Sequence, residues 1–182
     1  MSVEPPGVRI DEAHADLLYG LVRAHKPQRV LEFGFGGGRS AEAILKALAG
    51  NGNEACYILV DNWSDWGGAI PDEARCFLAR YPAAQVVVAP EERFVSRCRE
   101  QFDFIMSDAD HFHTQRWFGD VYDRLLAPGG VLVYHDCRAF PGIALIVDAC
   151  ERERFRYVVF DRCSADGEAC HRGLLCIFKP LE

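Results

Sequence analysis

Residues 29–40 read Arg-Val-Leu-Glu-Phe-Gly-Phe-Gly-Gly-Gly-Arg-Ser, and this stretch decides the fold. A short apolar run ends in four glycines within five residues, and the amphipathic residues 40–49 follow directly. A strand that runs into a glycine loop and then a helix is the place where an open α/β sheet binds its ligand. The stretch therefore predicts a fold class and the position of a site.

Apolar runs alternate with helical patterns along the rest of the chain, which predicts parallel strands with helices on both faces. The expected strands are residues 29–33, 56–60, 85–89, 102–106, 131–134, 157–160 and 174–178, and the expected helices are 11–25, 40–49, 71–80, 91–99, 114–126 and 143–152. The last two strands are joined only by a loop containing Asp166 and Gly167, so we expect an antiparallel pair and a reversed last strand.

Length and charge limit the function classes. The 182 residues are 49% apolar with a net charge of −7, which favours one domain over residues 1–182 and argues against nucleic acid as a partner. The longest apolar stretches fall short of the roughly 18 residues that span a bilayer, so we expect a cytoplasmic protein without a membrane partner. The N-terminal helix, residues 11–25, is expected to act as a partial cap.

Eight cysteines occur without a CxxC pair, which is typical of free thiols in a reducing compartment. Four residues whose side chains can bind metal ions lie close together in the sequence near the C-terminus: Cys163, Cys170, His171 and Cys176. Their spacing matches no standard zinc motif, so core packing is the preferred interpretation.

The glycine loop can be compared with three ligand-binding motifs. A phosphate loop would need a Gly-Lys pair, which is missing here, and a dinucleotide fingerprint that starts at Gly34 would need glycine or alanine where Arg39 stands. The third pattern, ExGxGxG, is met in full by Glu32, Gly34, Gly36 and Gly38. It lets the backbone approach a ligand that has no pyrophosphate, while a purely structural turn is the minority interpretation.

The second expected strand ends at Asp61, where a carboxylate can accept two hydrogen bonds from a ribose diol. This role suits NAD and S-adenosylmethionine equally. The following loop, residues 63–68, contains two tryptophans that could stack on a purine, wall a substrate pocket or pack as a lid.

Taken together, these features resemble the class I S-adenosylmethionine-dependent methyltransferases over nearly the whole chain. The resemblance is carried by residues 32–38, Asp61, residues 102–108 and residues 126–133. It implies an α/β, doubly wound, Rossmann-like fold with a seven-stranded, mostly parallel sheet and a reversed last strand. The reversed strand agrees with the antiparallel ending read from the residues themselves.

The resemblance also implies a donor site for S-adenosylmethionine. The loop carbonyl groups would hold the methionyl ammonium group, Asp61 the ribose, and the turn Ala89-Pro90-Glu91 the adenine edge. The implied donor-binding residues are Glu32, Gly34, Phe35, Gly36, Gly38, Ser40, Asp61, Asn62, Trp63, Ala89, Pro90, Glu91 and Asp108.

Within the class, Asp108-Ala-Asp-His111 and Tyr134-His-Asp136 resemble small-molecule O-methyltransferases such as the catechol and macrolide-sugar enzymes. Metal-dependent members hold Mg²⁺ at positions that correspond to Asp108, His135 and Asp136. The chain departs from that pattern because His135 stands where a carboxylate is usual. Since Mg²⁺ prefers oxygen ligands, metal dependence is left open.

The resemblance implies methyl transfer to a hydroxyl group of a small molecule, with Asp108 and a nearby histidine as the catalytic groups. His135, oriented by Asp136, is the favoured base because imidazole accepts protons near neutral pH, and His111 is the second choice. An inactive donor-binding module that serves as a sensor or partner subunit is the alternative, and Arg39 disfavours a nicotinamide oxidoreductase. The short chain leaves little for an acceptor pocket, so the expected sources of its walls are the helix over residues 11–25, the loop 63–68, the turn 137–142 or a second subunit in a homodimer.

Overall fold

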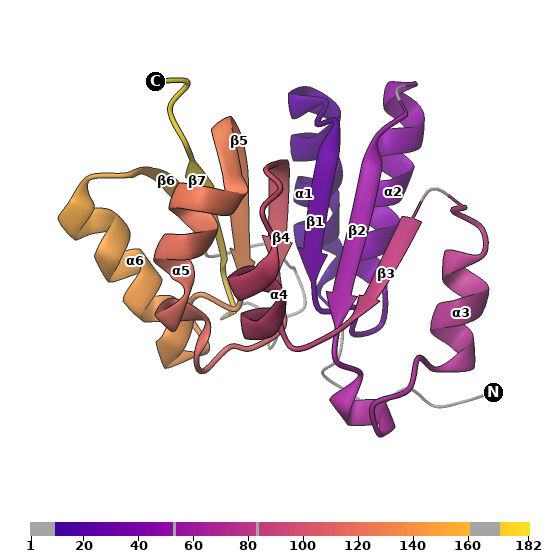
Figure 1. The fold of residues 1–182 in the computed structure, drawn as a ribbon. Helices are drawn as coiled ribbons and strands as arrows, with labels where there is room; N and C mark the ends of the chain where they lie inside the picture. The colour runs from indigo at the N-terminus through magenta and orange to yellow at the C-terminus, as the bar shows by residue number, and fades with distance from the viewer. Residues whose placement is uncertain (1–9, 53, 83, 161–171) are drawn as a thin grey trace.

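The computed structural model describes residues 10–52, 54–82, 84–160 and 172–182, which contain one seven-stranded sheet in the order β3-β2-β1-β4-β5-β7-β6 (Figure 1). The strands are β1 (Arg29–Phe33), β2 (Cys56–Asp61), β3 (Ala84–Val88), β4 (Phe102–Ser107), β5 (Leu126–His135), β6 (Arg156–Phe160) and β7 (Leu174–Phe178). Strands β3, β2, β1, β4 and β5 pair in parallel, and β7 pairs antiparallel with both β5 and β6. The predicted doubly wound sheet with a reversed last strand is confirmed.

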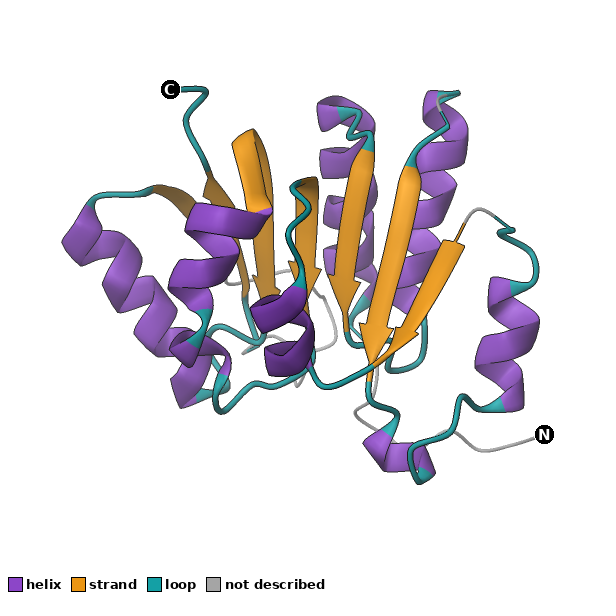
Figure 2. Cartoon of the chain, in the orientation of Figure 1, coloured by secondary structure: helices purple, strands orange, loops and turns teal. Residues whose placement is uncertain are grey.

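Helices cover both faces of the sheet, with α1 and α2 on one face and α4, α5 and α6 on the other (Figures 1 and 2). The helices are α1 (Glu12–His25), α2 (Arg39–Asn51), α3 (Asp72–Leu78), α4 (Glu91–Arg97), α5 (Phe118–Asp120) and α6 (Pro141–Glu153), with short turns η1 (Ser64–Trp66), η2 (Thr114–Arg116) and η3 (Val121–Leu125). None of the helices in these described ranges has both the length and the apolar composition needed to cross a bilayer.

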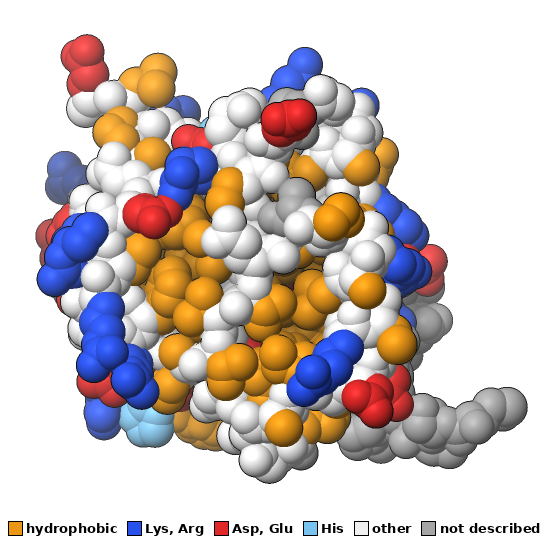
Figure 3. All heavy atoms as spheres, turned by 45° about the vertical axis from the view of Figure 1, so that its right-hand side comes forward, with side chains coloured by type: hydrophobic (Ala, Val, Ile, Leu, Met, Phe, Trp, Pro, Cys, Tyr) orange, Lys and Arg blue, Asp and Glu red, His pale blue; other side chains and the backbone are white. Residues whose placement is uncertain are grey.

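Side chains that alternate along the strands fill two apolar layers. On β1, Val30 packs on the α1 and α2 side, whereas Leu31 and Phe33 pack on the opposite side. All three side chains are fully buried. The central strand β1 is therefore buried on both faces, as expected for parallel strands in an α/β protein, whereas the edge strands β3 and β6 are partly exposed. Figure 3, which brings the β3 side of the molecule forward, shows hydrophobic side chains gathered in a hollow between charged ones.

Two expectations about local structure need correction. The helix expected over residues 114–126 is divided into η2, α5 and the π-helical turn η3. The strand expected over residues 131–134 starts earlier, at Leu126, because Leu126 pairs with Phe102 before the register shifts and the ladder continues from Val131 opposite Phe104. Of the cysteine cluster, Cys176 is buried on β7, while Cys163, Cys170 and His171 lie outside the described residues.

The glycine loop depends on a close approach of two backbone segments. Gly34 has φ +88°, and a Cβ atom placed there would lie 2.4 Å from the carbonyl oxygen of Asp108. The Gly34 N–H donates to the Val60 carbonyl oxygen at 2.9 Å, and the Asp108 N–H donates to the Phe33 carbonyl oxygen at 2.9 Å. Only glycine satisfies the angle and the contact together.

A buried carboxyl group holds the start of α2 to the sheet. Glu32 is fully buried and accepts hydrogen bonds from the Ser40 hydroxyl at 2.6 Å and from the Tyr57 hydroxyl at 2.5 Å. Burial raises the pKa of Glu32 from 4.5 to about 7, although the two hydroxyl donors partly offset the shift. Glu32 therefore connects β1, α2 and β2 beneath the loop.

We predict that Gly34→Ala destabilises the protein by at least about 2 kcal/mol, because backbone strain adds to a backbone clash. Gly52→Ala is the matched control: its φ is +71°, but an added Cβ meets no described atom within 4 Å. It should cost about 1 kcal/mol. Equal losses in chemical denaturation would contradict the close-approach argument.

We also predict that the free energy of unfolding falls as pH rises from about 5 to 8. Glu32 has a raised folded-state pKa, so above pH 4.5 the unfolded chain releases a proton that the folded protein retains. Glu32→Gln should remove about 3 kcal/mol of this decline. The exposed Glu54→Gln is the control. Denaturant titrations at several pH values with the same slope in wild type and Glu32→Gln would refute the assignment.

Candidate functional site

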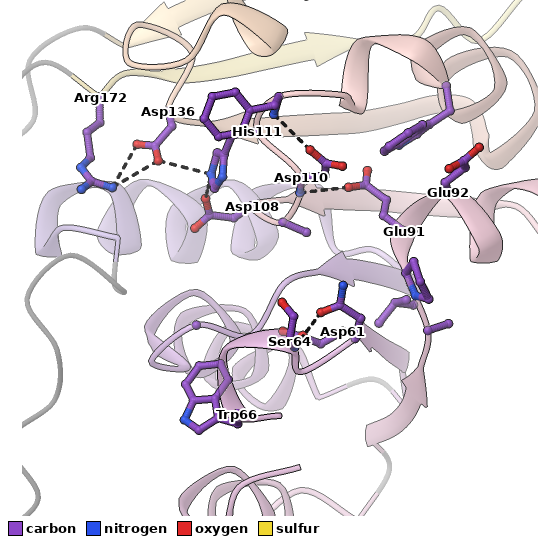
Figure 4. Close-up of a pocket in the computed structure, with 18 residues that line it drawn as sticks. Asp61, Ser64, Trp66, Glu91, Glu92, Asp108, Asp110, His111, Asp136 and Arg172 are labelled. Atoms are coloured by element: carbon purple, nitrogen blue, oxygen red, sulfur yellow. Dashed lines mark hydrogen bonds and ion pairs between the residues drawn. The ribbon is translucent and has the colours of Figure 1, made fainter. Parts of the chain in front are cut away.

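A pocket of about 470 Å³ opens at the carboxyl ends of β1, β2, β4 and β5 (Figure 4). Its lining residues come from the ends of these strands and the segments that follow them, from the turn after β3, and from Arg172 just before β7. They are Gly36, Val60, Asp61, Asn62, Ser64, Trp66, Ala89, Pro90, Glu91, Glu92, Asp108, Ala109, Asp110, His111, Phe112, Trp117, Asp136 and Arg172. The volume lies within the range of small-molecule sites.

One wall is formed by Asp61 and the glycine loop. The Asp61 carboxylate accepts hydrogen bonds from the Phe35 N–H at 2.7 Å and the Trp63 N–H at 2.6 Å. These bonds fix the carboxylate at the pocket wall, where carboxylate oxygens can accept hydrogen bonds from a ligand. Gly36, with φ +50°, brings bare backbone to the same wall.

Glu91 closes another part of the wall. Its carboxyl group accepts from the Ser107 hydroxyl at 3.3 Å, the Thr114 hydroxyl at 3.2 Å and the Asp110 N–H at 3.5 Å. Burial raises the pKa of Glu91 to about 7, against the effect of these donors. Glu91 therefore ties the turn after β3 to the end of β4.

The opposite wall is a network of carboxylates and cationic groups. His111 Nε2 lies 2.9 Å from Asp108 Oδ1 and 3.3 Å from Asp136 Oδ2. Arg172 Nη1 lies 3.2 Å from Asp136 Oδ2 and 3.5 Å from Asp136 Oδ1. The His111 ring packs on Phe140 with the ring centroids 4.6 Å apart, and Figure 4 shows Asp136 between Arg172 and His111.

Proton affinities in this network follow from burial and charge. Burial alone would raise the pKa of Asp108, but the neighbouring His135 and His111 lower it below the usual range. Burial alone would lower the pKa of His111, but the Asp108 carboxylate outweighs it and raises the pKa. Asp108 is therefore a stable anion, and His111 is a stronger base than an isolated imidazole.

His135 occupies a different position from His111. Its side chain is 1% exposed, and it is not among the described residues that line the pocket. Its Nδ1 lies 3.1 Å from Asp136 Oδ1 and 3.4 Å from Asp108 Oδ1, behind the pocket wall. Burial opposes the charged form, but Asp108 and Asp136 raise the pKa of His135 to about 10.

About half of the expected donor-binding residues reach the pocket surface, and the others support it from beneath. The lining group is Gly36, Asp61, Asn62, Ala89, Pro90, Glu91 and Asp108. The remaining residues, Glu32, Gly34, Phe35, Gly38, Ser40 and Trp63, shape the loop or pack below it. Helix α1, the expected partial cap, packs against α2 and contributes none of the described lining residues.

Several lining residues were missed in the sequence. Phe112 and Trp117 follow the Asp108 motif closely, so a wider window around that motif would have included them. Arg172 lies 36 residues from its partner Asp136 and carries no local signal. Only the antiparallel return of β7 beside β5 brings it to the pocket.

The expected magnesium ligands do converge, because donor atoms of Asp108, His135 and Asp136 lie within 4.8 Å of one another. However, Arg172, His111 and His135 already face the two carboxylates. Adding Mg²⁺ would place a dication among these groups and require an imidazole ligand that this ion disfavours. The side chains of Asp108, His135 and Asp136, with the partners they have here, therefore do not fit Mg²⁺.

Solved structures share the fold. The O-methyltransferase TomG from Streptomyces achromogenes, involved in tomaymycin synthesis and in complex with SAM, has 17% identity, a TM-score of 0.75, and coverage of 96% of this chain and 83% of its own. The Bacillus cereus O-methyltransferase in complex with SAH has 19% identity, a TM-score of 0.73, and coverage of 96% of this chain and 84% of its own. A Geobacter sulfurreducens methyltransferase has 19% identity, a TM-score of 0.72, and coverage of 95% of this chain and 81% of its own.

No curated protein sequence matches the chain significantly. Residues 31–137 match the model of a family described as a methyltransferase domain, and the matched region runs from β1 to the end of the carboxylate network. Because this region is more than half of the 182 residues, the chain belongs to that methyltransferase-domain family.

Proposed function

We propose that this protein is an S-adenosylmethionine-dependent methyltransferase that modifies a hydroxyl group of a small molecule. The observation that carries the proposal is one pocket with the glycine loop and Asp61 on one side and Asp108 and His111 on the other (Figure 4). The neighbours from Bacillus cereus and Streptomyces achromogenes, which hold SAH and SAM, support the same donor.

The residues present fit this donor. Bare backbone at Gly36 allows close approach of the methionyl part, and Asp61 presents carboxylate lone pairs to a ribose diol. Ala89, Pro90 and Glu91 form a half-apolar edge for a purine. The Asp108 anion lies where a positive sulfonium group gains from a negative neighbour.

When bound, S-adenosylmethionine supplies an electrophilic methyl carbon, so that an acceptor oxygen forms the new O–C bond as the C–S bond breaks and S-adenosylhomocysteine leaves. We assign His111 as the group that accepts the hydroxyl proton. Its Nε2 faces Asp108 and Asp136, which orient the ring and stabilise the imidazolium, and Nδ1 is left to take the proton. His135 then acts from behind the wall by positioning both carboxylates.

Aromatic and cationic side chains border the acceptor side. Phe112 is 59% exposed and Trp66 is 37% exposed, and both line the pocket with Arg172. Exposed aromatic rings beside a reaction site favour a flat hydroxylated acceptor. No observation on the described residues favours the inactive sensor module.

The remaining expectations are part of this proposal. The whole chain would act as one methyltransferase domain in the cytoplasm, without nucleic acid or membrane partners. A homodimer would supply the cap that α1 does not provide. The edge strand β3, where Val88 is 54% exposed, is a surface on which a second copy could pack.

We predict that Asp61→Ala weakens S-adenosylhomocysteine binding by about 10- to 100-fold, because hydrogen bonds to a charged acceptor are lost. Asp61→Asn, which keeps the shape, should weaken binding less. The exposed Asp72→Ala on α3 is the control. Calorimetric titration that gives wild-type affinity for Asp61→Ala would exclude this donor site.

We further predict that His111→Ala lowers the rate of methyl transfer by about 10²- to 10⁴-fold, since a general base is lost. The rate is measured as S-adenosylhomocysteine formed with a panel of catechols, sugars and other hydroxylated metabolites. The affinity for S-adenosylhomocysteine should stay within a few-fold of wild type. His113→Ala, which removes a half-exposed imidazole paired with Asp110, should keep full turnover. Full turnover of His111→Ala would show that the base lies elsewhere.

A further inference from the structure

A second cluster of metal-ligand atoms lies behind the pocket, where α1 meets the end of β5. Asp11, His14 and His135 offer ligand atoms that all lie within 4.8 Å of one another. His14 Nδ1 is 2.8 Å from Asp11 Oδ2 and 3.1 Å from His135 Nε2. None of the three lines the pocket among the described residues, but His135 also contacts Asp108 and Asp136 of the pocket wall, so the cluster lies directly behind that wall.

The start of α1 builds two of the three ligands. Asp11 is the N-cap residue, and its Oδ1 accepts from the His14 N–H at 2.8 Å. The two residues are three apart at the start of a helix, which places both side chains on one face. Capping uses one carboxylate oxygen, and the other oxygen is directed at the His14 ring.

No single protonation state of the His14 ring makes both contacts of its Nδ1, to Asp11 and to His135, good hydrogen bonds. If Nδ1 carries a hydrogen, one hydrogen must serve Asp11 and His135 in two directions. If Nδ1 carries a lone pair, it can accept from His135, but it then faces the Asp11 carboxylate lone pairs at 2.8 Å. In each protonation state one contact is at best half satisfied. A cation between the three atoms satisfies all of them.

The other nitrogen of His135 lies near two carboxylates. Its Nδ1 lies 3.1 Å from Asp136 Oδ1 and 3.4 Å from Asp108 Oδ1. Histidines that bind metals usually direct the second ring nitrogen at a carboxylate, and the metal ion then replaces the hydrogen on the opposite nitrogen. Nε2 of His135 is the nitrogen that faces His14.

Size and ligand type indicate the kind of ion. Ligand atoms about 2.0–2.1 Å from a tetrahedral zinc ion are about 3.3 Å apart. The two separations from His14 Nδ1, 2.8 Å and 3.1 Å, would need to open by only a few tenths of an ångström, and all three ligand atoms lie within 4.8 Å of one another. Two imidazoles and one carboxylate suit a divalent transition metal and not Mg²⁺. The side chains of His14 and His135 are 3% and 1% exposed, while that of Asp11 is 13% exposed.

We propose that Asp11, His14 and His135 bind one divalent transition-metal ion, with zinc as the representative ion. The ion joins α1 to the carboxyl end of β5 and fixes His135 behind Asp108 and Asp136. It is a structural and positioning site, which explains why α1 lies close to the catalytic wall without lining it. The proposal does not depend on the identity of the methyl acceptor.

The test is a calorimetric titration of the chelator-treated full chain with Zn²⁺. One equivalent should bind and raise the melting temperature, since the ion binds the folded chain. Asp11→Asn retains a good N-cap residue and should weaken zinc binding by at least about tenfold, and His14→Ala should abolish it. Asp16→Asn, on the exposed side of α1, is the matched control and should bind as wild type does. Binding of S-adenosylhomocysteine by every variant verifies that each one is folded.

Co²⁺ provides a second readout, because its visible spectrum reports the ligands directly. A spectrum of nitrogen and oxygen ligation that disappears in Asp11→Asn supports the site. Three results would overturn it: no stoichiometric zinc binding by wild type, unchanged binding by both Asp11→Asn and His14→Ala, or thiolate charge-transfer bands that assign the ion to cysteines. Zinc binding that is lost in Asp108→Asn but kept in His14→Ala would move the ion to the pocket wall and also refute the proposal.

Discussion

The backbone of Gly34 lies against the backbone of Asp108, and the rest of the site depends on this contact. A side chain at Gly34 would come within 2.4 Å of the Asp108 carbonyl oxygen, so the two loops can meet only with glycine in between. β1 lies between β2 and β4, and the ends of all three strands converge there. The contact thereby sets how far the donor wall, with Asp61, stands from the wall that carries Asp108 and His111. Specific chemistry on this fold comes from side chains placed on those strand ends.

The second wall is defined by charge. Asp108 and Asp136 are two anions close together, and His111, His135 and Arg172 approach them from three directions. Buried carboxylates are retained at low cost only when they are paired in this way. The same pairing makes His111 more basic. Asp136, with φ +62°, adopts a left-handed conformation that aspartate tolerates better than most residues, which turns its carboxylate toward Arg172 and His111.

Much of the fold could be predicted from local patterns. The glycine loop, the alternation of apolar runs and helices, and the loop-joined last strands identified the sheet and its reversed strand. The helix expected over residues 114–126 is instead divided into 3-10, α and π turns, and it ends one residue early because β5 starts at Leu126. In the donor wall, Asp61 at the end of β2 and Glu91 in the turn after β3 were predictable because strand ends are visible in the sequence. The contact of Arg172 with Asp136 and the contact of His14 with His135 could not be predicted. Tertiary packing brings together residues that lie 36 positions apart in the first pair and 121 in the second.

The most direct test is a crystal structure of the protein with S-adenosylhomocysteine. We expect the nucleoside between Asp61 and the turn at Ala89, Pro90 and Glu91, the amino acid end at Gly36, and the sulfur atom directed toward Asp108 and His111. Density for the ligand at another place, or no binding at millimolar concentration, would contradict the assignment of this pocket to methyl transfer.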